Sequence, residues 1–311
     1  MKKTTSILLA LLTITSLSFA IAQDDETPPS TDTVSPTPDP TIAITEGDIT
    51  LHLYSDSIPQ GRAGLIRVTG PKIVAAQAHF LGQSIDLFAV NGKTGFYGLL
   101  GVNMDQSIRT YGLVVSIIGE DGSEEVIATP VKVTGGGFIQ QPVTLPEDRM
   151  SLIDPVIESD ELTLIRDIAA VRTPQRLWDE RGFRFPIEAR LTSPFGAVRT
   201  FNGSLSTRHT GWDFQAQIGI PMASSASGRV AFAGPLAIRG NYVLIDHGYG
   251  IYSGYAHLSI IHVTRGQVVA AGQIIGQVGN TGRSSSAHSH LDFLVNGEWV
   301  DAVDFIALPL P

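Results

Sequence analysis

The sequence predicts a mostly β protein, in which two β-rich regions flank a short helical connector. Most of the 311 residues fall into short apolar or alternating runs separated by Gly, Asn, Asp and Pro, a pattern typical of antiparallel sheets. Only the segment "SDELTLIRDIAAVR", residues 159–172, has the apolar periodicity of an amphipathic helix. The chain is long enough for two domains, and its 43% hydrophobic content allows a large core.

The N-terminal segment, residues 1–22, predicts a secretory signal peptide. Lys2 and Lys3 form a positive n-region, residues 7–19 are mostly apolar, and a small-x-small cleavage site ends at Ala22. Cleavage two residues earlier and an uncleaved anchor are the alternatives, although the apolar run is short for a membrane span. We therefore expect a secreted or periplasmic, cell-wall-associated protein with no membrane contact after cleavage.

Two segments that differ in amino-acid composition follow the predicted signal peptide. Residues 23–40 are mainly Pro, Thr, Ser and Asp, which predicts an extended linker. In residues 41–137, runs such as "DITLHLYSDS", "AGLIRVTG" and "TYGLVVSIIG" follow one another closely. This spacing predicts an antiparallel β-sandwich of immunoglobulin-like type.

Residues 138–182 predict a connector with one helix, the only helix that the mature sequence indicates. Ser159 is the expected N-cap, and Pro174 is expected to close the helix. The apolar stripe of this helix consists of Leu162, Ile165, Ile168 and Ala169.

Residues 183–311 return to a β pattern with frequent glycines, which predicts an antiparallel sheet. "HGYG" indicates a hairpin loop between strands at 242–246 and 251–257. "NG" at 296–297 predicts a type I′ hairpin turn.

The composition excludes several classes of partner and site. A formal net charge of -9 does not favour nucleic acid or an anionic membrane as a partner. The absence of cysteine excludes disulfides and thiolate metal sites.

Six of the eight histidines lie between residues 209 and 290. His52 and His79, in the first region, are expected to be half-buried or surface polar groups. A metal or catalytic site gathers histidines, whereas a generic β domain does not need them, so the second region is the candidate for function.

Two short motifs in that region carry the residue types of a zinc site. In "RHTGWDF", His209 and Asp213 are four apart, and in an extended segment both can point to one face. In "HSHLDF", His288 and His290 are two apart on a predicted strand and share a face. A set of two imidazoles and one carboxylate leaves a fourth tetrahedral position for water, the arrangement of a catalytic zinc site.

Each motif also has a simpler interpretation. His209 and Asp213 are compatible with a loop held by a capping hydrogen bond. The H-x-H pair is compatible with ordinary polar residues on an exposed strand face. His257, in "GYAHLS", is compatible with a core histidine whose hydrogen bonds are satisfied.

The order of the motifs narrows these alternatives. "TSPFG" with Arg199, "HTGWD", "GYAHLS", "VTRGQVVAAGQIIGQVGNTGRS" and "HSH" occur in the same order as in lysostaphin-like or LytM-type zinc metallopeptidases, which are bacterial cell-wall endopeptidases. Residues 183–305 resemble this family, and the motifs are specific jointly rather than singly.

The resemblance implies a site and a reaction. His209, Asp213 and His290 would bind one Zn²⁺ per chain, and His257 and His288 would be the catalytic pair beside the zinc-bound water. We assign the general base to His288 and oxyanion stabilisation to His257, although the sequence does not fix which residue has which role. The implied substrate is a peptidoglycan peptide, cleaved at a D,D cross-link or a glycyl bridge.

Other residues of this region have expected structural roles or depart from the family. We expect His247 to orient its hairpin and His262 to be a surface strand residue. Residues 288–292 are H-S-H-L-D where the family has H-L-H-F-E, and residues 284–287 are "SSSA" where it has "STGP". These departures leave every proposed ligand in place, and we expect them to affect substrate preference.

Two functions of other classes remain open at the level of sequence. One is a catalytically weak or inactive LytM-like regulator that binds and activates a cell-wall amidase. The other is a binding module without activity. The zinc content of the purified protein discriminates between the regulator and the enzyme.

Overall fold

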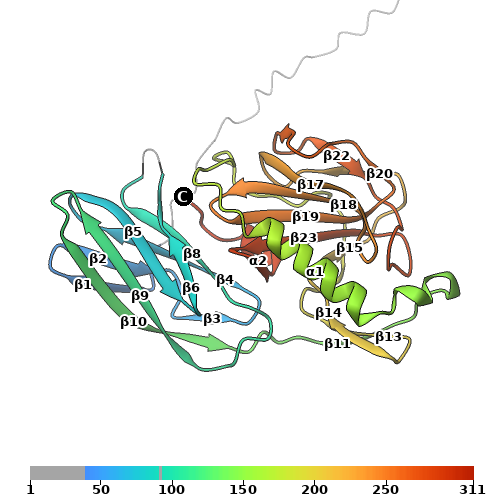
Figure 1. Cartoon of the computed structure of the whole chain (residues 1–311), viewed down its shortest axis with the longest axis horizontal. Helices are drawn as coiled ribbons and strands as arrows, with labels where there is room; N and C mark the ends of the chain where they lie inside the picture. Colours follow the sequence, from blue (N-terminus) through green and yellow to red (C-terminus); the bar gives the residue numbers. More distant parts are fainter. Residues whose placement is uncertain (1–38, 91–92) are drawn as a thin grey trace, which may run out of the picture. The chain divides into compact units, whose positions relative to one another are not determined.

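The computed structural model describes residues 39–90 and 93–311, and this part of the chain is mostly β, as predicted (Figure 1). The predicted signal peptide, residues 1–22, lies outside the described residues, as does the predicted linker up to residue 38. Among the described helices, none combines the length and the apolar character that a membrane crossing requires.

The N-terminal strands form two five-stranded sheets. Their inward side chains share one apolar core, to which Leu51, Val68 and Val115 contribute. The strand pairs are antiparallel except β3 with β10, which is parallel. The first sheet has the order β1 (Ile42–Glu46), β2 (Ile49–Leu53), β4 (Ala63–Thr69), β8 (Phe96–Gly101), β7 (Phe88–Ala89), and the second has β3 (Ser57–Pro59), β10 (Glu124–Thr134), β9 (Thr110–Gly119), β5 (Ile73–Phe80), β6 (Gln83–Asp86).

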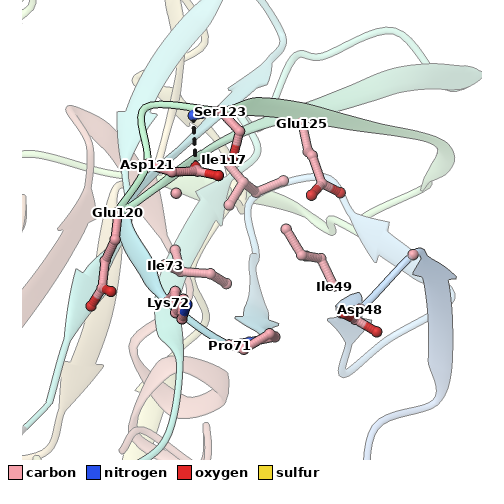
Figure 2. A pocket seen from close by; sticks show the side chains of 12 residues that line it. Asp48, Ile49, Pro71, Lys72, Ile73, Ile117, Glu120, Asp121, Ser123 and Glu125 are labelled. Atoms are coloured by element: carbon pink, nitrogen blue, oxygen red, sulfur yellow. Dashed lines mark hydrogen bonds between the residues drawn. The ribbon is translucent and has the colours of Figure 1, made fainter.

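A surface cavity of about 560 Å³ lies among the turns at one end of these sheets (Figure 2). Four exposed carboxylates and one lysine line it, namely Asp48, Glu120, Asp121, Glu125 and Lys72. The backbone N–H of Ser123 donates to Asp121, which orders the turn between β9 and β10. Solvated acidic side chains are ordinary surface groups, and this cavity contains no histidine.

The connector contains β11 (Gln140–Val143), the 3₁₀-helix η1 (Glu147–Leu152) and the helix α1 (Pro155–Ala169). The predicted N-cap Ser159 is wrong. The side chain of Asp154 caps α1 by accepting from the backbone N–H groups of Val156 and Ile157. Pro155 occupies the first turn, where a missing N–H costs nothing. The apolar stripe of the sequence did not predict this first turn of α1, because Val156 is exposed and does not belong to the buried face.

The helix ends at Ala169, five residues before Pro174. It is also not the only helix of the mature chain. A five-residue helix, α2 (Ala302–Ile306), is capped by Asp301. Neither α2 nor η1 is long enough to produce a helical period in the sequence.

The C-terminal region is built on one eight-stranded sheet, as the predicted antiparallel pattern requires. Strand β23 lies between β15 and β19, and both neighbours pair with it in antiparallel register (Figure 1). The sheet has the order β12 (Leu191–Ser193), β15 (Gly211–Phe214), β23 (Ser289–Val295), β19 (Ile251–Leu258), β18 (Gly240–Gly248), β17 (Gly228–Leu236), β21 (Val268–Val269), with β24 (Glu298–Val300) also paired to β23. Two three-stranded sheets flank it, β16 (Pro221–Ala223) with β22 (Ile274–Gln277) and β20 (Ile260–Ile261), and β11 with β13 (Val198–Phe201) and β14 (Leu205–Arg208).

Both predicted hairpin turns are confirmed. The loop between β18 and β19 consists of Tyr249 and Gly250, and the loop between β23 and β24 consists of Asn296 and Gly297. All four residues have positive φ, as a type I′ turn requires. These turns fix the register of β19 and β23, the two strands from which histidines reach the candidate site.

Candidate metal centre

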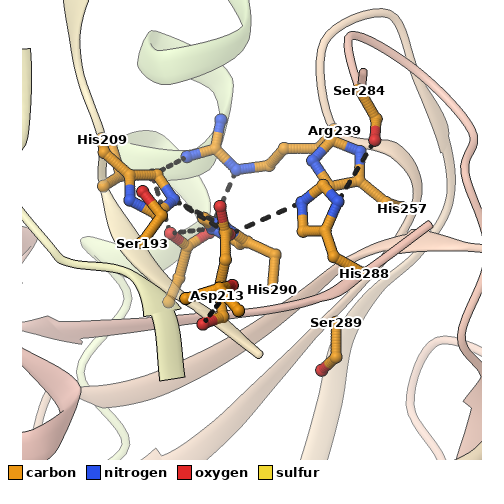
Figure 3. A network of polar contacts seen from close by, with 12 residues as sticks. Ser193, His209, Asp213, Arg239, His257, Ser284, His288, Ser289 and His290 are labelled. Atoms are coloured by element: carbon orange, nitrogen blue, oxygen red, sulfur yellow. Dashed lines mark hydrogen bonds and ion pairs between the residues drawn. The ribbon is translucent and has the colours of Figure 1, made fainter. Parts of the chain in front are cut away.

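Three of the predicted site residues, His209, Asp213 and His290, meet at strands β15 and β23 of the large sheet (Figure 3). Asp213 on β15 lies directly opposite His290 on β23. Asp213 Oδ1 is 2.9 Å from His290 Nδ1 and 3.1 Å from His209 Nε2, and the two imidazole nitrogens are 3.0 Å apart. Of the described residues, these three form the group whose ligand atoms lie close enough to share a metal ion.

Hydrogen bonds on the far side of each imidazole select the nitrogen that faces the centre. His209 donates from Nδ1 to the carbonyl of Pro194 at 2.8 Å, which leaves the lone pair of Nε2 for a ligand bond. His290 donates from Nε2 to Asp292 Oδ1 at 2.9 Å, which leaves Nδ1. Metal-binding histidines are usually oriented by such an outer partner.

The charges around the centre suit a cation. Burial alone would raise the pKa of Asp213, but the neighbouring His209 and the guanidinium of Arg199 lower it well below its usual range. Arg199 forms an ion pair with Asp213 and donates to Ser193 Oγ at 2.7 Å. The carboxylate is therefore ionised and held in one orientation.

The two ligand histidines have opposite pKa shifts. Burial, with a smaller contribution from Arg199, lowers the pKa of His209 to about 4, so its imidazole is neutral near pH 7. Burial opposes protonation of His290 as well, but the carboxylates of Asp292 and Asp213 raise its pKa to about 9. The cluster thus attracts positive charge at His290, and a divalent cation would supply that charge in place of a proton.

His288 and His257, the predicted catalytic pair, lie beside the three ligand residues (Figure 3). His288 donates from Nδ1 to the carbonyl of Ser286 at 2.8 Å. Its Nε2 is buried, has no hydrogen-bond partner, and lies 3.5 Å from Asp213 Oδ1. A buried nitrogen without a partner is costly unless another group fills the space in front of it. Together with the N, N, O donor set, this nitrogen indicates that the residues fit a metal ion with a polar ligand of its own.

His257 is held in a backbone conformation that non-glycine residues rarely adopt, with φ of 59°. The register between β18 and β19 shifts at this point, so that a β-bulge turns the side chain toward His288. The two imidazole rings are 4.8 Å apart between centroids. Strained residues of this kind gather at functional sites.

The same histidine has a fixed tautomer and a fixed charge. His257 donates from Nδ1 to the carbonyl of Thr281 at 2.7 Å, which leaves Nε2 unprotonated. Burial, with His288 and His290 nearby, lowers the pKa of His257 well below its usual value, so the ring is neutral near pH 7.

The remaining histidines lie outside the centre. His52 is half-buried against Thr69, and His79 is exposed beside Ser84. His262 is exposed, but it follows β20 rather than lying within a strand. His247 is fully buried and bridges the carbonyl of Ser227 and the hydroxyl of Ser253, at 2.9 and 2.7 Å.

His247 gives a testable dependence of stability on pH. Burial lowers its pKa to about 4, against about 6.5 in an unfolded chain. The unfolded state therefore binds the extra proton first, so the stability from this neutral ring is full above pH 6.5 and is lost as the pH falls toward 4. Between pH 7 and pH 4.5 we expect wild type to lose about 2–3 kcal/mol more unfolding free energy than His247→Gln. Urea denaturation at both pH values, with a chelator present so that metal release does not contribute, measures this difference, and parallel losses in the two proteins contradict it.

Sequence reasoning missed several polar residues that support the centre. In the sequence, Asp292 stands out only as the last residue of H-S-H-L-D, where the family has Glu, yet in the structure it accepts a hydrogen bond from His290. It lies two residues after His290 on the same strand, so the period of two could have placed both on one face. Arg239 and Glu161, which lie behind Asp292, have no local motif.

The fold and the cluster together define a β domain built around a metal site of two histidines and one aspartate. Residues 207–302 match peptidase family M23.

Curated relatives agree with the match. The chain is 39% identical over 139 residues to DD-carboxypeptidase/endopeptidase Mpg of Neisseria meningitidis serogroup B, which covers 43% of this chain and 31% of the relative. It is 38% identical over 128 residues to peptidoglycan DD-endopeptidase ShyA of Vibrio cholerae, which covers 40% of this chain and 30% of the relative. The chain thus spans about a third of the length of the curated relatives it matches.

A solved structure shares the fold over a longer stretch. The crystal structure of a putative peptidase M23 from Pseudomonas aeruginosa covers 79% of this chain and 94% of its own, with a TM-score of 0.60 and 23% identity.

Proposed function

We propose that the chain is a zinc-dependent metalloendopeptidase that hydrolyses peptide cross-links of bacterial peptidoglycan. The observation that carries this proposal is the convergence of His209, Asp213 and His290, with the unpartnered Nε2 of His288 beside them. The relatives named as a DD-carboxypeptidase/endopeptidase and as a peptidoglycan DD-endopeptidase support a cell-wall peptide as substrate.

His209, Asp213 and His290 would hold the zinc ion. Zinc at such a site lowers the pKa of a bound water to about 7 and polarises a carbonyl. The Nδ1 of His288 donates to Ser286, and its Nε2 has no partner, so Nε2 is the nitrogen positioned to accept a proton as general base. The His257 ring is neutral with Nε2 free. If Nε2 takes up the proton released by the attacking water, it can donate that proton to a developing oxyanion or to the leaving amine.

The domain organisation that we propose follows the changes in composition and apolar pattern along the sequence. Residues 41–137 would be an immunoglobulin-like domain that positions the enzyme on the intact wall. Residues 138–182 would be the connector and residues 183–311 the catalytic domain. With a signal peptide at residues 1–22, the protein would act outside the cytoplasm, where its substrate is found.

One observation favours the amidase-activating regulator as a second candidate function. On the side of α1, the cavity at the metal centre has a volume of only about 50 Å³, and Glu158 and Leu162 of the helix line it. A peptide substrate needs more space, since a cavity of this volume holds only a few waters, at about 10–15 Å³ each. A regulator would not need an open cleft.

The experiment that decides between these functions is the digestion of purified sacculi of two wall types by the zinc-loaded mature protein. We expect release of muropeptides whose masses identify a cleaved peptide cross-link, and no release by the His290→Ala variant. A wild-type protein that binds zinc yet releases nothing from either wall, or from soluble muropeptides, contradicts the enzyme and favours the regulator.

A further inference from the structure

Two buried glutamates of the connector helix α1 reach the loops that surround the metal centre. Glu158 and Glu161 have exposed fractions of 9% and 6%. Glutamate is almost never buried unless it is paired, so the partners of these two residues show what the helix holds in place.

Glu161 holds the segment that leads into β18. One of its oxygens accepts from the backbone N–H of Ile238 at 2.7 Å, and the other accepts from the backbone N–H of Arg239 at 2.9 Å. The guanidinium of Arg239 adds an ion pair at 3.3 Å. The helix therefore fixes both the backbone and the side chain of Arg239.

Arg239 in turn reaches the outer partner of a metal ligand. Its Nε donates to Asp292 Oδ2 at 3.1 Å, and its Nη2 donates to Thr210 Oγ1 at 2.8 Å. Asp292 Oδ1 accepts from Thr210 at 2.7 Å and from His290 Nε2 at 2.9 Å. Tyr242 donates its hydroxyl to the remaining oxygen at 3.1 Å. Both oxygens of Asp292 therefore carry two hydrogen bonds each.

We propose that Glu161 and Arg239 are positioning residues of the metal centre. They act through Asp292 on the orientation of the His290 imidazole, so the connector helix is a part of the site rather than a spacer. Asp292 and Arg239 are both buried, and a buried charge that loses its partner is strongly destabilised. Without the charge of Glu161, the Arg239 side chain would shift, and Asp292 would move with it. The His290 imidazole would then rotate, and its Nδ1 would no longer lie beside Asp213 Oδ1.

This role rests on the function proposed above, because it requires a metal ion at His290. Glu158 provides a matched control on the same face of the same helix. Glu158 is also buried, but its ion-pair partner is Arg283, at 2.8 Å. The guanidinium of Arg283 lies over the ring of Phe201 and has no contact with Asp292. Removing the charge of Glu158 tests whether α1 remains docked, and it leaves the contacts from Glu161 through Arg239 and Asp292 to His290 unchanged.

The test compares the full mature chain with Glu161→Gln and Glu158→Gln, each an isosteric loss of one buried charge. Zinc affinity is measured by competition with a chromophoric chelator, and ligand geometry by the visible absorption of the Co²⁺-substituted protein. We expect Glu161→Gln to weaken zinc affinity by about 10-fold, the low end of the cost of losing an outer partner, because Glu161 acts on His290 only through Arg239 and Asp292. The Co²⁺ spectrum should also change. Glu158→Gln should retain the affinity and the spectrum of wild type.

Arg239→Lys keeps the positive charge but loses the planar fork that joins Glu161 to Asp292. It should weaken zinc binding in the same direction, so the test holds if Glu161→Gln fails to fold. Wild-type affinity and spectrum in the folded variants, or an equal loss in Glu158→Gln, overturn the positioning role. A wild-type chain that binds no zinc contradicts instead the function proposed above.

Discussion

Replacing His290 with alanine is expected to remove the proposed zinc binding by the mature chain and, with it, the release of muropeptides. The substitution removes one of three ligand atoms that lie within 3.1 Å of one another. It also leaves the buried carboxylates of Asp213 and Asp292 without the imidazole between them. We expect zinc affinity to fall by more than about 100-fold, since losing an outer partner alone costs about 10- to 100-fold.

The metal content of dialysed protein, measured by mass spectrometry, checks this expectation. Close to one zinc per chain is expected in wild type. The matched control is His262→Ala, because His262 is exposed and lies outside the centre. Full zinc occupancy in a His209, Asp213, His290 triple alanine variant would remove the basis for the assignment.

Replacing His288 with alanine, in contrast, should leave the zinc bound and slow turnover by about 100- to 10,000-fold, the usual scale for a lost general acid or base. The three ligand atoms do not depend on His288, whose contact to Asp213 is longer, at 3.5 Å. Turnover on a soluble muropeptide, with zinc content measured in the same preparation, separates loss of chemistry from loss of metal. Near-wild-type turnover in a zinc-loaded variant would make His288 a structural residue.

The same loss of turnover is expected at His257, but the choice of substitution matters there. Histidine adopts a left-handed conformation more readily than alanine does, so His257→Ala mixes added strain with lost chemistry. Asparagine tolerates this conformation better and offers no base. We expect His257→Asn to keep both the melting temperature and the zinc while losing turnover. A large fall in melting temperature with turnover unchanged contradicts a catalytic role.

The sequence could predict the metal cluster because its motifs occur in the order of a known family. The strand period alone placed both His288 and His290 on one face and did not choose between them as ligands. His209 and Asp213 are an even number apart, but His209 lies in the short segment before β15, so the period of a strand does not fix its direction. The turn at Asn296 and Gly297 was predictable from those two residues alone, since the backbone conformation that it requires favours them.

The support behind the cluster could not be predicted in this way. Glu161 and Arg239 are 78 residues apart, and Arg239 and Asp292 are 53 apart. No local period links them, and each alone is an ordinary charged residue. The predicted N-cap of α1, Ser159, was wrong for a related reason. The true cap, Asp154, precedes a turn in which the apolar residue Val156 faces solvent, so the turn has no apolar periodicity. The bulge at His257 depends on the register of two strands, which a single strand does not encode.

The pairing of β15 with β23 has a consequence for the order of folding. Asp213 and His290 are 77 residues apart in the sequence, so an unfolded chain has to close a long loop before these two residues can share an ion. Non-local pairings of this kind form slowly compared with hairpins such as β18–β19. The proposed zinc ion would then bind after the sheet has assembled. It would stabilise the folded state by mass action, by about 4 kcal/mol when free zinc is a thousandfold above the dissociation constant. A chain that folds where zinc is scarce would complete the same sheet but would unfold more readily, so the metal supply of the compartment would set how long the folded protein lasts.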